Sequence, residues 1–176
     1  MLSRVYISLG SNIEPERYLK SGLMELNYHF GKLRYSSVYE SEAVGFDGNN
    51  FLNMVVAVDT DLSIEELVFL FKKIEQDNGR LVGAKKFASR TLDLDLLLYG
   101  DKVTLTPVEL PRAEILTNAF VLWPMAELAP DLVHPLVNIS YQRLWDAYDK
   151  TQQRLWPVSF VWATDLVDES LNSYQA

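Results

Sequence analysis

Two aspartates stand two positions apart, at Asp93 and Asp95, in an otherwise apolar run that ends at Leu98. Side chains alternate between the two faces of a β-strand, so this spacing predicts that both carboxylates share one face and the leucines at 92, 94, 96 and 98 the other. At a separation of roughly 6 to 7 Å, the charges repel by about 2 to 3 kcal/mol at an effective dielectric of about 20. A divalent cation removes that repulsion, and carboxylate oxygens suit Mg²⁺ that also binds water and phosphate. By itself, however, an Asp-x-Asp pair is more often a pair of surface acids on an edge strand.

The segment before this pair is strongly basic. Residues 79–90 contain Arg80, Lys85, Lys86 and Arg90 and no acidic residue, although the whole chain has 24 acidic and 16 basic residues. Cationic side chains bind phosphate oxygens, and carboxylates bind the magnesium that accompanies them. Together, the basic segment and the acidic pair favour a site for a nucleoside triphosphate and its metal over a merely solvated loop.

Other common catalytic arrangements are missing from the sequence. The chain has no cysteine, and residues 79–86 lack the Gly-Lys-Ser/Thr ending of a Walker-type phosphate loop. The two histidines, His29 and His134, lie far apart in sequence and are expected to be surface or packed residues rather than metal ligands. If a nucleotide binds here, side chains and metal must hold its phosphates.

Length and composition indicate one domain. A chain of 176 residues that is 48% hydrophobic can bury a core without disulfides; we expect residues 1–163 to form this domain and residues 164–176 a frayed polar tail. The lack of cysteine suits a reducing compartment, and no signal peptide or membrane-spanning run is evident, so a cytoplasmic location is expected. The formal net charge of −8 disfavours a general nucleic-acid binder.

Apolar residues repeat with strand and helix periods in turn. Strands are predicted over residues 5–9, 33–39 and 51–59 and at the acidic pair, with a tight turn at Gly10-Ser11-Asn12 after the first of them. A helix is predicted to begin near Pro15.

A second helix is predicted to begin at Ser63, which has the spacing of a capping box with Glu66, and to end near Gly79. Strand, helix, two strands, helix and strand form the ferredoxin-like βαββαβ order of the α+β class, an antiparallel sheet with helices packed on one face. Five prolines between residues 107 and 135 are expected to break the following segment into turns and short pieces. A last helix is predicted within residues 139–154 and an edge strand over 158–163.

Several short blocks, in the same order, resemble those of a known enzyme family. They are Gly10-Ser11-Asn12, Phe51-Leu52-Asn53, Gly79-Arg80, Ser89-Arg90-Thr91-Leu92-Asp93-Leu94-Asp95, Leu122-Trp123-Pro124-Met125 and Leu128-Ala129-Pro130. The set is similar to the 6-hydroxymethyl-7,8-dihydropterin pyrophosphokinases of folate biosynthesis, and the similarity runs from about residue 4 to residue 135.

This resemblance implies transfer of pyrophosphate from ATP to the hydroxymethyl oxygen of a pterin, with release of AMP. It assigns Asp93 and Asp95 to two Mg²⁺ ions that bridge the phosphates. Part of the basic segment would then be a mobile loop that closes over ATP. The basic side chains that the resemblance implies at the nucleotide are Arg80, Lys85, Lys86 and Arg90.

For the pterin, the resemblance implies a flat slot. Phe51 and Phe120 match the positions whose rings bracket the heterocycle, and Asn53 matches the residue that hydrogen-bonds its edge. Backbone groups near Ser41 and Val44 complete this implied site. The resemblance also favours a monomer that binds ATP and a pterin, with no nucleic-acid or membrane partner.

Some positions depart from the family pattern. Phe87-Ala88-Ser89 stands where Trp-Gly-Pro is usual, Arg112 where a histidine is typical, and Asn118 where the family supplies another phosphate-binding arginine. Arg112 is therefore a candidate for the ATP-binding contact that Asn118 cannot make. Glu75 matches a family position near the pocket, without an assigned role.

Two alternatives to the enzyme stay open. A divergent paralogue would keep the fold and the pterin slot but have an altered substrate preference or little turnover. A ferredoxin-like nucleic-acid module would share the topology, but the acidic charge and the lack of an RNA-binding aromatic signature count against it.

Overall fold

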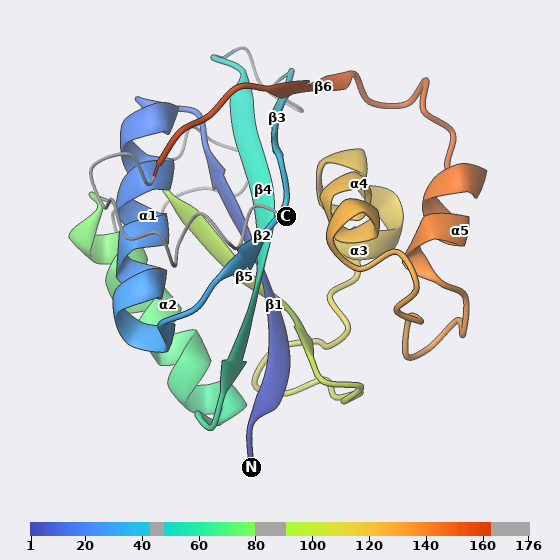
Figure 1. Ribbon diagram of the computed structural model, residues 1–176, viewed down its shortest axis with the longest axis horizontal. Helices are drawn as coiled ribbons and strands as arrows, with labels where there is room; N and C mark the ends of the chain where they lie inside the picture. Colours follow the sequence, from blue (N-terminus) through green and yellow to red (C-terminus); the bar gives the residue numbers. More distant parts are fainter. Residues whose placement is uncertain (43–47, 80–90, 163–176) are drawn as a thin grey trace.

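Strands and helices alternate along the chain in the computed structural model, which describes residues 1–42, 48–79 and 91–162 (Figure 1). The described strands are β1 (Ser3–Ser11), β2 (Arg34–Tyr35), β3 (Val38–Ser41), β4 (Phe51–Thr60), β5 (Asp93–Tyr99) and β6 (Leu155–Val158). The described helices are α1 (Pro15–Phe30), α2 (Ile64–Asp77), α3 (Glu114–Thr117), α4 (Ala119–Leu128) and α5 (Tyr141–Ala147).

The strands form one antiparallel sheet in the order β5-β1-β4-β3-β6, and β2 also pairs with β4. β1 is flanked by β4 and β5 and is antiparallel to both. Two split βαβ crossovers, one through α1 and one through α2, produce this order. The predicted ferredoxin-like βαββαβ arrangement is therefore confirmed, and β6 extends it beyond β3.

The strand predicted over residues 33–39 is divided at Ser36. The Ser36 backbone N–H donates to the Val55 carbonyl (2.9 Å), and the Ser36 hydroxyl accepts from the Val55 N–H (3.0 Å). A side-chain oxygen thus takes the place of a backbone carbonyl in the ladder, so regular pairing resumes only at Val38. An alternating apolar pattern does not distinguish a continuous strand from one interrupted by such a bond.

Helices α1 and α2 cover one face of the sheet and bury the first core, as Figure 1 shows. The predicted capping box of α2 is present, because Glu66 N donates to Ser63 Oγ (3.1 Å) and Ser63 N donates to Glu66 Oε2 (2.8 Å). Both helices turn an apolar stripe inward. The fully or nearly buried members of these stripes are Leu19, Leu23 and Leu26 of α1 and Leu67, Phe71 and Ile74 of α2.

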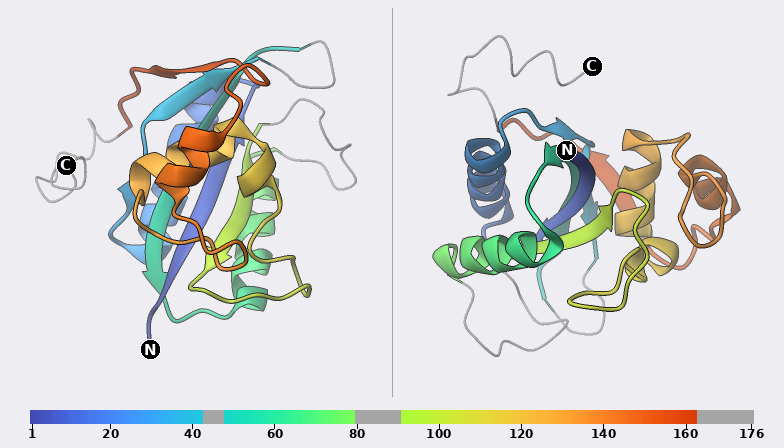
Figure 2. Two further views of the ribbon diagram at one scale, coloured as in Figure 1. Left: turned by 90° about the vertical axis from the view of Figure 1, so that its right-hand side faces the viewer. Right: turned by 90° about the horizontal axis from the view of Figure 1, so that it is seen from below.

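A second core lies on the opposite face, where α4 packs on β4 and β3, and α5 packs on α4. Figure 2 shows the resulting layers, with helices on both sides of the sheet. The two helices of the βαββαβ unit, α1 and α2, share one face as predicted, and α4 and α5, which follow that unit, add a layer on the other face. The predicted chain break at Pro124 is wrong, because this proline is buried inside α4. Because α4 is packed between the sheet and α5, apolar burial offsets the hydrogen bond that a proline removes.

A β-bulge in β5 reverses the alternation of its side chains. Ile7 of β1 pairs with Leu96 and Tyr6 pairs with Leu98, so Leu97 is the extra residue. The leucines before the bulge lie in the first core, whereas Leu97 and Leu98 both lie in the second. The predicted common face for the leucines is therefore correct as far as Leu96 and wrong for Leu98.

The C-terminal elements differ in extent from those predicted. The last helix lies within the predicted range: α5 follows Ser140, whose hydroxyl accepts from Arg143 N (3.3 Å), and it ends at Ala147. The edge strand expected over 158–163 is β6 at Leu155–Val158, paired with β3. The predicted tail at 164–176 lies outside the described residues. Among the helices that the structure describes, none is long and apolar enough to cross a bilayer.

The two histidines are a surface and a packed residue, as predicted. His29 is exposed near the end of α1, whereas His134 is 1% exposed. The Nδ1 atom of His134 accepts hydrogen bonds from Leu136 N (3.2 Å) and Val137 N (3.3 Å). Burial lowers the pKa of this imidazole.

We expect acidification to destabilise the fold through His134. Because its folded pKa lies below the value of about 6.5 for an unfolded histidine, the unfolded state binds the proton first. The stabilisation by neutral His134 is complete above about pH 6.5 and is lost as the pH falls toward the folded pKa. Urea unfolding between about pH 7.5 and about pH 5 measures this decline, which His134→Gln should lessen. His29→Gln is the matched control, and an equal decline in both variants would contradict the prediction.

Candidate active site

A row of residues crosses the second face of the sheet on four neighbouring strands. Asp93 of β5 pairs with Gly10 of β1, Gly10 pairs with Asn53 of β4, and Asn53 pairs with Tyr39 of β3. Directly paired residues project from the same face, here the face that α4 covers. With strands about 4.8 Å apart, Asp93 lies about 10 Å from Asn53 across the sheet. The register thus brings together positions that are far apart in sequence.

Gly10 allows the Asn53 amide to lie across β1. A Cβ atom at position 10 would stand 2.8 Å from Asn53 Oδ1, which is too close for a non-bonded contact. Asn53 is only 8% exposed, and its Nδ2 donates to Ser41 Oγ at 3.3 Å. Gly10 was predicted to lie in a turn, but it belongs to β1. A glycine within a strand pattern is the sequence signal for such a close approach.

The second carboxylate lies further along the same face of β5. Asp95 pairs with Ser8, and its side chain is about half exposed. The Nη2 atom of Arg112 lies 3.9 Å from Asp95 Oδ1, while Nε of Arg112 donates to the Leu96 carbonyl (3.1 Å). The backbone N–H of Arg112 also donates to the Leu97 carbonyl (3.0 Å). Arg112 is therefore anchored on β5 with its positive charge beside Asp95.

Glu75 connects α2 to the acidic strand. Glu75 is 8% exposed, and its Oε2 accepts from the backbone N–H of Leu94 at 2.9 Å. Among the strands that the structure describes, β5 lies at the edge of the sheet, so none of them pairs with this N–H on its outer side. Because Leu94 stands between the two aspartates, Glu75 fixes the backbone from which both project.

The two predicted ring positions belong to elements that face one another. Phe51 begins β4 and pairs with Ser41, and Phe120 lies in the first turn of α4, which packs on β4. Both phenylalanines are half-buried. The chain entering β4 is held by Asn12, whose Nδ2 donates to the Asn49 carbonyl at 3.2 Å.

Asp93 and Asp95 suit a metal ion that takes its other ligands from water and the phosphates of a nucleotide. Among residues 1–42, 48–79 and 91–162, no cluster of three or more His, Cys, Asp or Glu side chains is arranged to hold an ion. Two carboxylates on one strand leave most positions of an octahedral Mg²⁺ for water and phosphate oxygens. Asp93 and Asp95 therefore fit such an ion.

Several predicted site residues lie outside the described residues, so the structure says nothing of them. They are Val44, Arg80, Lys85, Lys86 and Arg90, together with the Phe87-Ala88-Ser89 block. Asn118 is described: it is half-buried just before α4, and its carbonyl accepts from Leu122 N (2.9 Å).

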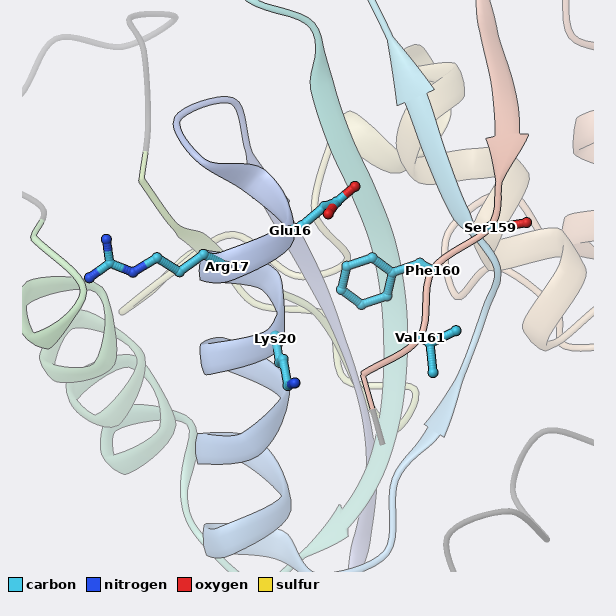
Figure 3. A pocket seen from close by; sticks show the side chains of 6 residues that line it. All are labelled: Glu16, Arg17, Lys20, Ser159, Phe160 and Val161. Carbon is cyan, nitrogen blue, oxygen red and sulfur yellow. The ribbon is translucent and has the colours of Figure 1, made fainter. Parts of the chain in front are cut away.

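A separate pocket of about 310 Å³ lies beside α1, on the first face (Figure 3). In Figure 3, Arg17 extends away from Phe160, on the side of α1 opposite to the segment that carries Ser159, Phe160 and Val161. None of the residues in the row from Asp93 to Tyr39 lines this pocket. Its lining residues are Glu16, Arg17, Lys20, Ser159, Phe160 and Val161.

Comparison with known proteins agrees with the fold and with the sequence blocks. Residues 6–130 match the family described as 7,8-dihydro-6-hydroxymethylpterin-pyrophosphokinase (HPPK). A 2-amino-4-hydroxy-6-hydroxymethyldihydropteridine pyrophosphokinase from Pseudomonas aeruginosa is 38% identical over 140 residues, which cover 77% of this chain and 86% of the relative. The enzyme of the same name from Aquifex aeolicus is 34% identical over 138 residues, with the same two shares.

A similar solved structure is that of Plasmodium falciparum HPPK-DHPS with pteroate. Its TM-score is 0.68 at 13% identity, and the match covers 84% of this chain and 42% of that larger one. At such low identity, this likeness concerns the fold alone.

The enzymes of these names transfer pyrophosphate from ATP to 6-hydroxymethyl-7,8-dihydropterin in folate synthesis. The family match covers most of the chain. It includes most of β1 and all of β4 and β5, which carry Gly10, Asn53 and Asp93, and it includes α4, which packs on that face of the sheet. The chain therefore belongs to the 7,8-dihydro-6-hydroxymethylpterin pyrophosphokinase family.

Proposed function

We propose that the row from Asp93 to Asn53 is the active site of this pyrophosphokinase, with ATP and its metal at the β5 end and the pterin at the β4 end. The observation that carries this proposal is the register, which sets Asp93, Gly10 and Asn53 on three adjacent strands facing one side. The separation of about 10 Å leaves room for phosphates and the pterin hydroxymethyl group between the two ends.

Asp93 and Asp95 are the proposed ligands of two Mg²⁺ ions. These ions would neutralise the phosphates and stabilise the negative charge that develops on the leaving AMP. Arg112 is proposed to supply the phosphate contact that Asn118 does not. Its anchor on the Leu96 carbonyl supports this role, because it limits the positions of the guanidinium. The remaining proposed phosphate ligands, which rest on the sequence, are Arg80, Lys85, Lys86 and Arg90.

The pterin is proposed to lie between the rings of Phe51 and Phe120, with its polar edge on the Asn53 amide. The hydrogen bond from Asn53 to Ser41 supports this assignment, because it orients the amide before a ligand arrives. Backbone groups at Ser41 and Val44 are the further predicted contacts.

In the reaction, the hydroxymethyl oxygen bonds to the β-phosphorus of ATP and releases its proton to water. The bond from this phosphorus to the oxygen that bridges to the α-phosphate breaks, and AMP leaves with that oxygen. Such transfer depends on alignment and charge neutralisation, so the protein needs no nucleophile of its own. In this proposal, Asn53 and the two phenylalanines align the acceptor, and Arg112 holds a positive charge near the transferred group.

We expect this chain to form AMP from ATP only when both 6-hydroxymethyl-7,8-dihydropterin and Mg²⁺ are present. Excess EDTA should reduce AMP formation to the background rate, and Mg²⁺ in excess of EDTA should restore it. A reaction without pterin measures simple ATP hydrolysis. AMP formation that persists in EDTA would contradict the metal dependence, whereas pterin binding without AMP would favour the divergent paralogue.

A monomeric state, a cytoplasmic location and the domain limits stay predictions from the sequence.

A further inference from the structure

One carboxylate fastens the end of α4 to the beginning of β3. Glu127 Oε1 accepts from Ser37 N (2.8 Å) and from the Tyr39 hydroxyl (3.0 Å), and Glu127 Oε2 accepts from Ser37 Oγ (2.6 Å). Hydrogen bonds to a charged group are stronger than those between neutral groups. Burial and the charge of Glu127 raise the pKa of Tyr39, so its hydroxyl stays protonated and donates at neutral pH.

A column of aromatic rings strengthens the same joint. The Tyr39 ring lies 4.6 Å from that of Trp123, which stacks at 5.0 Å on Trp145, and Trp145 stacks at 5.7 Å on Tyr148. Lys150 Nζ lies 4.5 Å from the centre of the Trp145 ring. The column runs from β3 through α4 to α5, so Tyr39 is held by its ring as well as by its hydroxyl.

The same stripe of α4 carries a proposed wall of the pterin slot. Phe120, Trp123 and Glu127 are spaced by three and four residues, so they project from one side of the helix. On the sheet, Tyr39 is the direct partner of Asn53. The contacts of Glu127 and Trp123 with Tyr39 therefore join the helix that carries Phe120 to the strand next to Asn53.

We propose that Ser37, Tyr39 and Glu127, here named the α4–β3 clamp, are positioning residues that set the width of the pterin slot. The inference rests on the proposed slot between Phe51 and Phe120. One wall belongs to α4 and the other to the sheet, so the separation of the walls depends on how α4 is docked. A flat ligand between two rings tolerates little change in that separation, because stacking requires close contact on both faces.

Tyr39→Phe tests the clamp because it removes the hydroxyl and keeps the ring. We expect the dissociation constant for 6-hydroxymethylpterin, measured by calorimetry, to rise about fivefold, and that for a non-hydrolysable ATP analogue to stay unchanged. Glu127→Ala should raise the dissociation constant for the pterin further than Tyr39→Phe does. Glu127→Gln, which retains one acceptor oxygen, should give a constant between those of the unaltered protein and Glu127→Ala. An equal loss of pterin and nucleotide affinity would indicate general loosening and overturn the proposal.

Two further variants separate the clamp from the slot. Tyr99→Phe also removes a tyrosine hydroxyl bond, to the Leu62 carbonyl at 2.7 Å on the first face, and it should leave pterin binding unchanged. Asn53→Ala should weaken pterin binding if the slot is correct. Weakening in Asn53→Ala without any in Tyr39→Phe and Glu127→Ala would overturn the clamp and leave the slot standing. Unchanged binding in Asn53→Ala would overturn both.

Discussion

Asp95→Asn is expected to lower kcat for AMP formation roughly a thousandfold while leaving the fold intact. The substitution keeps the shape of the side chain but removes the negative charge that would hold a metal against the phosphates. A thousandfold loss corresponds to about 4 kcal/mol of transition-state stabilisation, within the range expected for a metal ligand. The Asp95 side chain is 54% exposed, so the core does not depend on its carboxylate. Steady-state kinetics over a range of Mg²⁺ concentrations, with thermal unfolding in parallel, measure both parts of this prediction.

Asp101→Asn is the matched control for this substitution. Asp101 is an exposed acid in the turn after β5, six residues beyond Asp95, and it lies outside the proposed active site. We expect its replacement to leave kcat and the Mg²⁺ dependence unchanged. Full activity in Asp95→Asn would rule out the metal assignment, even if the enzyme still required Mg²⁺.

Gly10→Ala is expected to weaken pterin binding by about ten- to a hundredfold. The new methyl group would lie 2.8 Å from Asn53 Oδ1, so the amide must move away from the position in which it is proposed to meet the pterin edge. Loss of one or two hydrogen bonds in a buried site accounts for an effect of this size. Calorimetry with 6-hydroxymethylpterin measures the change, and affinity for a non-hydrolysable ATP analogue should be retained.

A double-mutant cycle shows whether Gly10 acts through Asn53. In the Asn53→Ala background, the amide that the new methyl group would displace is absent. Gly10→Ala should then add little further loss, so the two substitutions should be strongly non-additive. Additive losses would mean that the methyl group disturbs β1 itself and that the close approach to Asn53 is incidental.

Local sequence pattern was sufficient for much of the fold. The alternating leucines up to Leu96 and the capping box of Ser63 and Glu66 depend on interactions within a few residues, so they were predictable from spacing alone. The common face of Asp93 and Asp95 follows from the same alternation. The ordered blocks, including Arg90-Thr91-Leu92-Asp93-Leu94-Asp95, were sufficient for the family, which the comparisons confirm.

Contacts between distant residues decided the rest. The reversal at Leu97 follows from the register with β1, and the helical state of Pro124 follows from burial of α4 between the sheet and α5. The approach of Asn53 to Gly10 and the bonds from Ser37 and Tyr39 to Glu127 also join residues at least 43 positions apart. Spacing along the chain records which neighbours share a face, but not which distant residues meet across a sheet. The common face of the acidic pair was thus predictable from the sequence, whereas the geometry that connects it to Asn53 required the tertiary fold.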